Sequence, residues 1–241
     1  RLFGYHQAFL HPVTGWIVAG IAAALVLAAL AVFVLGRIGR LDDGRRRELQ
    51  ARTLTWAVLF PLMTGPVLLG AFWTIAAVGV LSLLCYREYA RATGLFRERA
   101  VSLTVVAGIF AVTFAAADHW YGFFVALFPL TVGAIAAAAV LADAPKGYLQ
   151  RVALGVLGFA LFGCALGHVG YFANDRNYRP ILLWLLLTVE FNDVFAYLTG
   201  KALGQRKLAP NTSPNKTIGG AVGAFLLTSA LTAVVGHFVF R

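Results

Sequence analysis

Long apolar runs, separated by short polar connectors, dominate the pattern of residues along this chain. A helix that crosses a bilayer needs about 20 apolar residues, and the runs lack the strict alternation of a membrane barrel strand. The first run extends from about Val13 to Gly36 and is followed, not preceded, by arginines, which indicates a true span rather than a signal peptide. The stretch from about Thr53 to Tyr89 is too long for one helix and predicts two, with a tight turn near Gly70. Further spans are expected at about 101–117, 123–142, 152–173, 181–200 and 218–240.

The composition supports the same interpretation. Hydrophobic residues make up 60% of the 241 residues and charged residues only 12%, which is too little polar surface for a chain folded in water. We therefore predict an all-α, polytopic transmembrane helical bundle of about eight spans, forming a single domain over residues 1–241. Its one long polar segment, at about 201–217, is expected to be a loop.

Positive charge indicates how the spans are oriented. The segment after the first span, residues 37–52, is expected to be a basic loop, and its Arg45–Arg47 cluster is most simply a topology signal and a contact for anionic head groups. When this segment is placed in the cytoplasm, most of the lysines and arginines fall on that side, as the positive-inside rule requires. The net charge of +10 is then explained without nucleic acid as a partner. The opposite side keeps four of the 20 cations, namely Arg1, Arg176, Arg179 and Arg241.

Two further patterns indicate packing rather than chemistry. Cys85 and Cys164 both lie in apolar runs and are expected to be small core residues, not a disulfide or a metal site. The five histidines show no ligand spacing. Glycines spaced four apart predict close helix contacts at Gly163/Gly167, Gly200/Gly204 and Gly219/Gly223.

Only two acidic residues, Glu190 and Asp193, lie within an apolar span. A carboxylate there is costly and is by default a functional candidate. Their spacing, extended to Tyr197, Gly200 and Gly204, predicts one helical stripe that can face the protein interior. The alternative is that each acid is buried and paired with an arginine of a neighbouring helix.

The polar segment that follows this span combines cations, hydroxyls and glycines. It contains Lys201, Arg206, Lys207 and Lys216, and a new helix is expected to open at Ile218. Flexible glycines, backbone amides at a helix start and nearby lysines can cradle a polyphosphate, and a carboxylate nearby can hold the Mg²⁺ that such a ligand brings. The segment does not match a P-loop. A merely basic linker is the alternative.

These residues also carry a resemblance to a known family. The string NDVFAYLTGKALGQRKLAPNTSPNKT resembles the D-x-x-A-Y, G-x-x-x-G and K-L-A-P-x-x-S-P-x-K-T segments of CDP-diacylglycerol synthases, also called phosphatidate cytidylyltransferases. The motif sequence is closest to that of a bacterial branch of the family. Outside these roughly 30 residues, the similarity is one of hydropathy and helix count. The matching positions are Asp193, Ala196, Tyr197, Gly200, Gly204, Lys207, Leu208, Ala209, Pro210, Ser213, Pro214, Lys216 and Thr217.

The resemblance implies a membrane-embedded nucleotidyltransferase that converts a phosphatidate-like lipid and CTP to CDP-lipid and pyrophosphate. It implies Asp193 as the ligand of the cofactor Mg²⁺, and Lys207 and Lys216 as catalytic residues that hold phosphates. The implied partners are CTP, the lipid substrate, membrane lipids and, as one possible assembly, a second copy of the chain. The implied location is the bacterial inner membrane, with the polar segment in the cytoplasm. The substrate-binding residues expected on this basis are Ser213, Thr217, Arg206, Tyr197 and Asn192.

Two departures from the family pattern affect these expectations. Ile218-Gly219-Gly220 stands where family members often have Trp-Glu-Gly. The chain also stops at Arg241 before a later signature with Lys-Asp, His-Gly-Gly and Asp-Arg-x-Asp elements, and it begins with Arg1 rather than Met, so we expect a fragment of a longer protein that is incomplete as an enzyme. Two alternative functions stay open: a CTP-dependent kinase of polyprenol-like lipids, and a transporter in which Glu190 and Asp193 relay protons.

Overall fold

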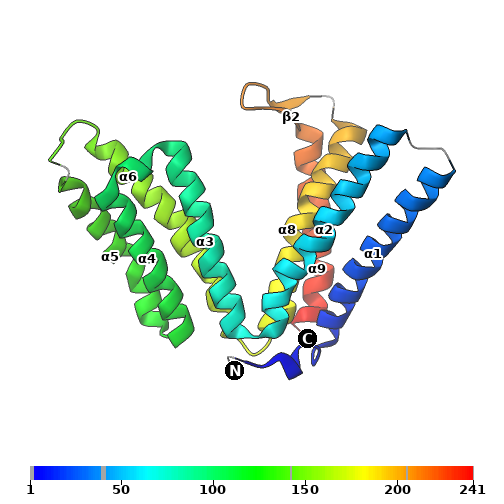
Figure 1. Cartoon of the computed structure of the whole chain (residues 1–241), viewed down its shortest axis with the longest axis horizontal. Helices are drawn as coiled ribbons and strands as arrows, with labels where there is room; N and C mark the ends of the chain where they lie inside the picture. The colour runs from blue at the N-terminus through cyan, green and yellow to red at the C-terminus, as the bar shows by residue number, and fades with distance from the viewer. Residues whose placement is uncertain (1–2, 39–41, 142, 205, 241) are drawn as a thin grey trace. The chain divides into compact units, whose positions relative to one another are not determined.

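Helices form nearly the whole structure, a computed structural model that describes residues 3–38, 42–141, 143–204 and 206–240 (Figure 1). Within this part of the chain, eight helices are long and apolar enough to cross a membrane. The sixth of them is formed by α6 and α7, which are joined by one turn-and-a-half of π-helix at Phe159–Ala165. The helices are α1 (Pro12–Arg37), α2 (Asp43–Leu69), α3 (Ala71–Thr93), α4 (Arg99–Asp118), α5 (Tyr121–Val140), α6 (Tyr148–Gly158), α7 (Leu166–Phe172), α8 (Tyr178–Leu203) and α9 (Ile218–Val239).

The eight spans and the all-α class are confirmed, and so is the turn near Gly70. Gly70 has a φ of 146°, a conformation that side chains with a Cβ rarely adopt, so glycine is required there. The Thr74 hydroxyl donates to the carbonyl oxygen of Pro66 at 3.1 Å and secures the start of α3 against the end of α2. Arg1, Arg40 and Arg241, which the charge pattern included, and Ala142, at one expected span end, lie outside the described residues.

The predicted basic loop at residues 37–52 is wrong in its second half, because α2 already begins at Asp43. The Arg52 guanidinium donates to the Glu48 carboxylate at 2.6 Å, four residues apart on the helix surface, a spacing that stabilises a helix. Arginine, glutamate, leucine and glutamine are also good helix formers. Polarity marks where the bilayer ends, not where the helix does.

The chain divides into two compact units. The first combines Pro66–Tyr178 with Arg1–His6 and contains α3 to α7. Its helices approach closely where glycines lie: a Cβ on Gly108 would stand 2.7 Å from the ring of the fully buried Phe159, and one on Gly167 would stand 2.4 Å from Val112 of α4. Gly167 thus makes the predicted close helix contact, whereas Gly163 faces the Phe159 ring within its own span.

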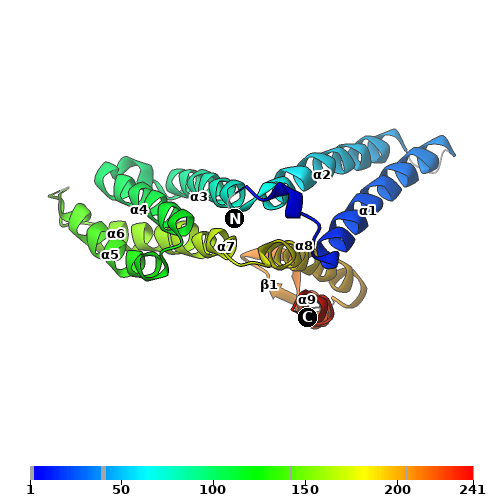
Figure 2. The ribbon, with the colours of Figure 1, turned by 90° about the horizontal axis from the view of Figure 1, so that it is seen from below.

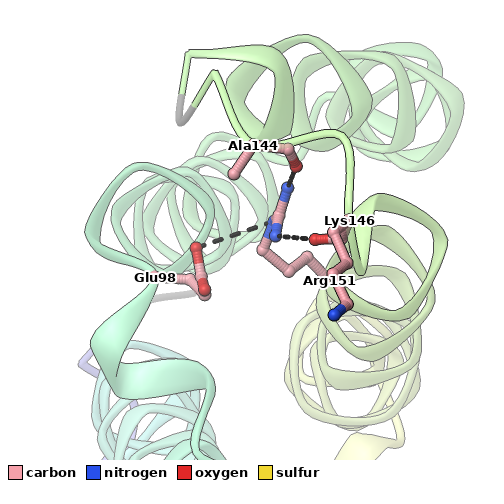
Figure 3. Close-up of polar contacts among 4 residues, drawn as sticks. All are labelled: Glu98, Ala144, Lys146 and Arg151. Atoms are coloured by element: carbon pink, nitrogen blue, oxygen red, sulfur yellow. Dashed lines mark hydrogen bonds and ion pairs between the residues drawn. The ribbon is translucent and has the colours of Figure 1, made fainter.

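Arg151 of α6 fixes the connector between α5 and α6 in this first unit (Figure 3). Its guanidinium donates to the backbone carbonyl oxygens of Ala144 and Lys146 and forms an ion pair with Glu98 at 3.7 Å. Glu98 precedes α4 as its N-terminal cap residue. One arginine thereby connects the starts of α4 and α6 with the loop between α5 and α6.

The second unit combines Gln7–Gly65 with Arg179–Arg241 and contains α1, most of α2, nearly all of α8, and α9. Helices α8 and α9 lie side by side in both views (Figures 1 and 2). A Cβ on Gly220 would stand 2.8 Å from the Ala196 carbonyl oxygen and 3.1 Å from the Cα of Gly200. The backbones of the two helices therefore meet, as the glycine spacing predicts.

Candidate functional site

The polar segment between α8 and α9 is a β-hairpin rather than the irregular loop that its composition suggests. β1 (Lys207–Ala209) pairs antiparallel with β2 (Ser213–Thr217), with Lys207 opposite Thr217 and Ala209 opposite Ser213. Proline has no N–H to donate a hydrogen bond between strands. Pro214 is tolerated because β2 is an edge strand of a two-stranded sheet. The sequence gives only the order of these residues along the chain. The hairpin brings them together across two paired strands.

Backbone contacts attach the hairpin to the helix pair. The Ile218 N–H donates to the Arg206 carbonyl oxygen at 2.9 Å, which closes the base of the hairpin. The side-chain oxygen of Thr217 accepts from the Gly220 N–H at 3.1 Å, so Thr217 is the N-cap of α9. A Cβ on Gly204 would stand 2.4 Å from that same oxygen. Glycine at this position lets the end of α8 approach the cap.

The cations of the hairpin are accessible at its surface. Arg206, Lys207 and Lys216 are all exposed. Lys207 lies across the ladder from Thr217, and residues directly opposite in a sheet share a face. The hydroxyl residues Ser213 and Thr217 are half-buried.

The predicted site residues on α8 have different environments. Asn192 accepts a hydrogen bond from the Thr228 hydroxyl of α9 at 3.2 Å and so forms part of the helix contact. Asp193 and Tyr197 are exposed, and Glu190 lines a pocket. The residues of the predicted stripe therefore have three environments: Gly200 packs against α9, Glu190 lines the pocket, and Asp193 and Tyr197 are exposed.

Asp193 lies well below the hairpin along α8. At 1.5 Å per residue, the helix separates it by about 15 Å from Leu203, the last residue of α8. Within the described ranges, no three or more His, Cys, Asp or Glu side chains come together to hold a metal ion. One carboxylate suits Mg²⁺ nonetheless, since this ion is commonly held by one or two carboxylates together with substrate phosphates.

A pocket of about 670 Å³ opens among α1, α2, α8 and α9 within the second unit. Its walls are apolar side chains such as Ile17, Phe60 and Leu187, and Glu190 is the one charged residue among the described residues that line it. This pocket could not be predicted from the sequence, because residues that face it are as apolar as residues that face lipid. The glutamate within an apolar span was the one signal that could have located it.

Cys85 and Cys164 are free thiols of intermediate burial rather than the fully buried core residues that the sequence predicts, and both lie in the first unit. Neither is near the hairpin in sequence or shares its unit. The candidate site of the second unit therefore consists of the hairpin, the two helix ends that carry it, Asp193 and the pocket.

Comparison with known proteins gives this arrangement a family context. The sequence profile of the cytidylyltransferase family matches residues 50–241. Uncharacterized protein YnbB of Escherichia coli is 27% identical over 224 residues, which is 89% of this chain and 72% of that protein. The phosphatidate cytidylyltransferase of Helicobacter pylori is 42% identical over 72 residues, 28% of this chain and 27% of that enzyme. The phosphatidate cytidylyltransferase of Brucella abortus is 32% identical over 120 residues, 36% of this chain and 44% of that enzyme. The match thus spans less than half of either enzyme, and no solved structure matches the chain.

Proposed function

This chain belongs to the cytidylyltransferase family, and from that premise we propose that it transfers the cytidylyl group of CTP to a phosphatidate-like lipid, forming CDP-lipid and pyrophosphate. The protein is an integral membrane protein, and the described part of its chain contains eight candidate spans. We further propose that its hairpin faces the cytoplasm of a bacterial inner membrane, where CTP is available.

The observation that carries the proposal is the hairpin itself. The family match includes the hairpin together with α8 and α9, and Lys207, Lys216 and Arg206 are exposed beside the start of α9. Cations at a helix N-terminus favour phosphate groups through charge and through the helix dipole. A triphosphate is a ligand of matching chemistry.

The reaction joins two anions and needs little covalent assistance from the protein. An oxygen of the lipid phosphate attacks the α-phosphorus of CTP, the bond from that phosphorus to the bridging oxygen of the β-phosphate breaks, and pyrophosphate leaves. Catalysis then consists of holding both anions and stabilising the charge that develops. Lys207 and Lys216 supply positive charge, and Ser213 and Thr217 supply hydroxyls. The oxygen of Thr217 is used as a cap acceptor, so its proton remains available to a ligand.

The two parts of the site have different tasks in this proposal. The hairpin holds the β- and γ-phosphates of CTP at the membrane surface. Asp193, about 15 Å from Leu203 along α8, would hold Mg²⁺ together with phosphate oxygens of the substrates. Mg²⁺, when bound, supplies positive charge to the phosphate oxygens. Tyr197 lies one turn from Asp193 toward the hairpin and is exposed, so it can contact the nucleotide between them.

Isotope position in the product tests the reaction class. The protein, expressed from its complete gene and purified in lipid nanodiscs, is supplied with phosphatidate, Mg²⁺ and CTP labelled either in the α- or in the γ-phosphate. Cytidylyl transfer places the α-label in the lipid and the γ-label in pyrophosphate. A CTP-dependent lipid kinase, tested with a polyprenol or diacylglycerol acceptor, places the γ-label in the lipid instead. Labelling of lipid from the γ-phosphate, or from neither position, would contradict the proposal.

A further inference from the structure

The pocket of the second unit begins where the proposed reaction site ends. Along α8, its lining residues run from Leu183 to Val194, a rise of about 17 Å. Val194 directly follows Asp193, so the pocket reaches the level of the proposed metal ligand. Arg179, at the start of α8, donates to the Gln7 carbonyl oxygen just before α1 at 3.4 Å, so the two helices leave a common end and run in the same direction. The pocket therefore extends from the level of Asp193 toward that common end.

The interior of the pocket contains one group that hydrocarbon cannot satisfy. Glu190 lines it, and among the contacts of the described residues none gives Glu190 a hydrogen bond or an ion pair. A carboxyl group at membrane depth is costly without a polar partner. A carboxyl group can form hydrogen bonds with oxygen-bearing groups of a ligand, such as hydroxyl groups. A ligand that is hydrocarbon along most of its length and carries oxygen near one end matches this lining.

We propose that this pocket binds one hydrocarbon chain of the lipid phosphate, and that Glu190 is a positioning residue for the oxygen-bearing linkage between that chain and the phosphate. The inference rests on the proposed function. Glu190 precedes Asp193 by three residues and lies about 4.5 Å deeper along α8. In an acylglycerol phosphate, ester or hydroxyl oxygens occur directly below the phosphate. In an isoprenoid phosphate, the chain there is pure hydrocarbon, so Glu190 favours the acylglycerol class.

Helix α1 supplies the wall that a substitution can move. Gly20 lines the pocket near the middle of the α1 lining, which runs from Val13 at the end remote from Asp193 to Leu25. A Cβ added at Gly20 meets nothing within 4 Å, and the same holds for Gly15, which lies on α1 outside the lining. Gly20→Leu should therefore fill the pocket without disturbing the helix, and Gly15→Leu is its matched control.

Chain length is the first readout. With Gly20→Leu, the KM for phosphatidate with long chains should rise by at least about ten-fold relative to phosphatidate with short chains, since one methylene in an apolar pocket discriminates by about 10–200-fold. Gly15→Leu should leave the ratio of the two KM values unchanged. An unchanged ratio in Gly20→Leu, or equal changes in both variants, would overturn the pocket as the chain site.

Head-group linkage is the second readout. Glu190→Leu should reduce the preference for phosphatidate over an isoprenoid phosphate of similar length, chiefly through the KM for phosphatidate, while Glu190→Gln should retain most of it because the amide still forms hydrogen bonds. A purely structural role would lower kcat for both lipids equally. Equal losses for both lipids, or an unchanged preference, would therefore overturn the role of Glu190.

A binding measurement separates this inference from the proposed function. Phosphatidate with a photoactivatable group near the chain terminus should form adducts with Ile17 or Leu183 in the pocket, and Gly20→Leu should abolish them. Adducts confined to lipid-facing residues such as Leu27 or Leu30 would overturn the pocket assignment even in an active enzyme. Pocket adducts in a protein that transfers no cytidylyl group would instead contradict the reaction and leave the chain site standing.

Discussion

The side-chain oxygen of Thr217 accepts a hydrogen bond from the Gly220 N–H at 3.1 Å, and this one contact joins the last residue of the hairpin to the first turn of α9. The same oxygen lies against Gly204 and Gly200 at the end of α8. Three elements that carry the candidate site therefore meet at one hydroxyl. Its removal is expected to affect stability and activity together.

Thr217→Val tests this contact, because valine keeps the shape of threonine and removes the acceptor. Loss of an N-cap costs about 0.5–2 kcal/mol, so the variant should unfold at a lower temperature and transfer cytidylyl groups more slowly. Thermal unfolding in detergent, followed by tryptophan fluorescence, measures the first effect. Thr217→Ser keeps the acceptor and should resemble the wild type; equal behaviour of the two variants would show that the cap is not needed.

Gly220→Ala should destabilise the second unit by forcing α8 and α9 apart. The added methyl group would stand 2.8 Å from the Ala196 carbonyl oxygen, and an overpacked contact typically costs about 1–3 kcal/mol. Thermal unfolding again measures the change. Gly15→Ala, with nothing within 4 Å of its new Cβ, is the control and should not be destabilised. If both variants unfold alike, the backbone contact contributes nothing to stability.

Asp193→Asn should reduce the cytidylyl transfer rate while the protein remains folded. The amide keeps the size of the side chain and removes the charge that Mg²⁺ requires. Loss of one such electrostatic contact typically costs on the order of a hundred-fold to a thousand-fold in kcat. Glu190→Gln should cost clearly less if it acts on lipid binding. A near-wild-type rate for a well-folded Asp193→Asn would contradict its assignment as the metal ligand.

Lys216→Ala should weaken CTP binding more than it slows turnover. A hydrogen bond to a charged group contributes about 1.5–3 kcal/mol, so the KM for CTP should rise on the order of ten-fold or more with a smaller change in kcat. Lys216→Arg should retain most of the affinity. Asn215→Ala, an exposed neighbour in the same strand, should leave the KM near the wild-type value, and a matching rise there would point to distortion of the hairpin instead.

The orientation of the spans can be tested with single cysteines in a background that lacks Cys85 and Cys164. With the hairpin in the cytoplasm, Lys146→Cys and Lys207→Cys should resist an impermeant maleimide in intact cells and react after permeabilisation. Tyr121→Cys, at the opposite end of α5, should react in intact cells. Reaction of Lys207→Cys in intact cells would place the hairpin outside and remove its access to CTP.

The spans could be predicted because the bilayer imposes one strong rule on sequence, that apolar runs must match its thickness. The rule says nothing about polar segments. It therefore placed the turn at Gly70 correctly and missed the polar first turns of α2 from Asp43, where helix formation depends on propensity and on the Arg52–Glu48 pair. The bilayer rule also missed the hairpin. The pairing of the short strands β1 and β2 depends on contacts with Gly204 and α9, and only the folded chain brings these residues together.

The residues of the candidate site could be predicted from the sequence, but their packing and exposure could not. Residue spacing brought Asp193 and Gly200 to one helix, but it did not show that Gly200 packs on α9 while Asp193 stays exposed. The pocket was even harder to predict from the sequence. Gly20 and Leu27 are both part of one apolar run. Only the packing of α1 against its neighbours decides that Gly20 lines a cavity while Leu27 faces lipid.

The length of α2 bears on the lipids that surround the protein. Its 27 residues extend about 40 Å, roughly 10 Å more than the hydrocarbon layer is thick. The first turns, with Arg45, Arg46 and Arg47, therefore stand among the head groups, where cations attract anionic lipids. Under the proposed function, the anionic lipids that these arginines attract include the lipid phosphate itself, and substrate is then supplied from a local pool richer than the average membrane. That pool shrinks as salt screens the arginines, and turnover at low substrate density becomes dependent on ionic strength without any change in the site itself.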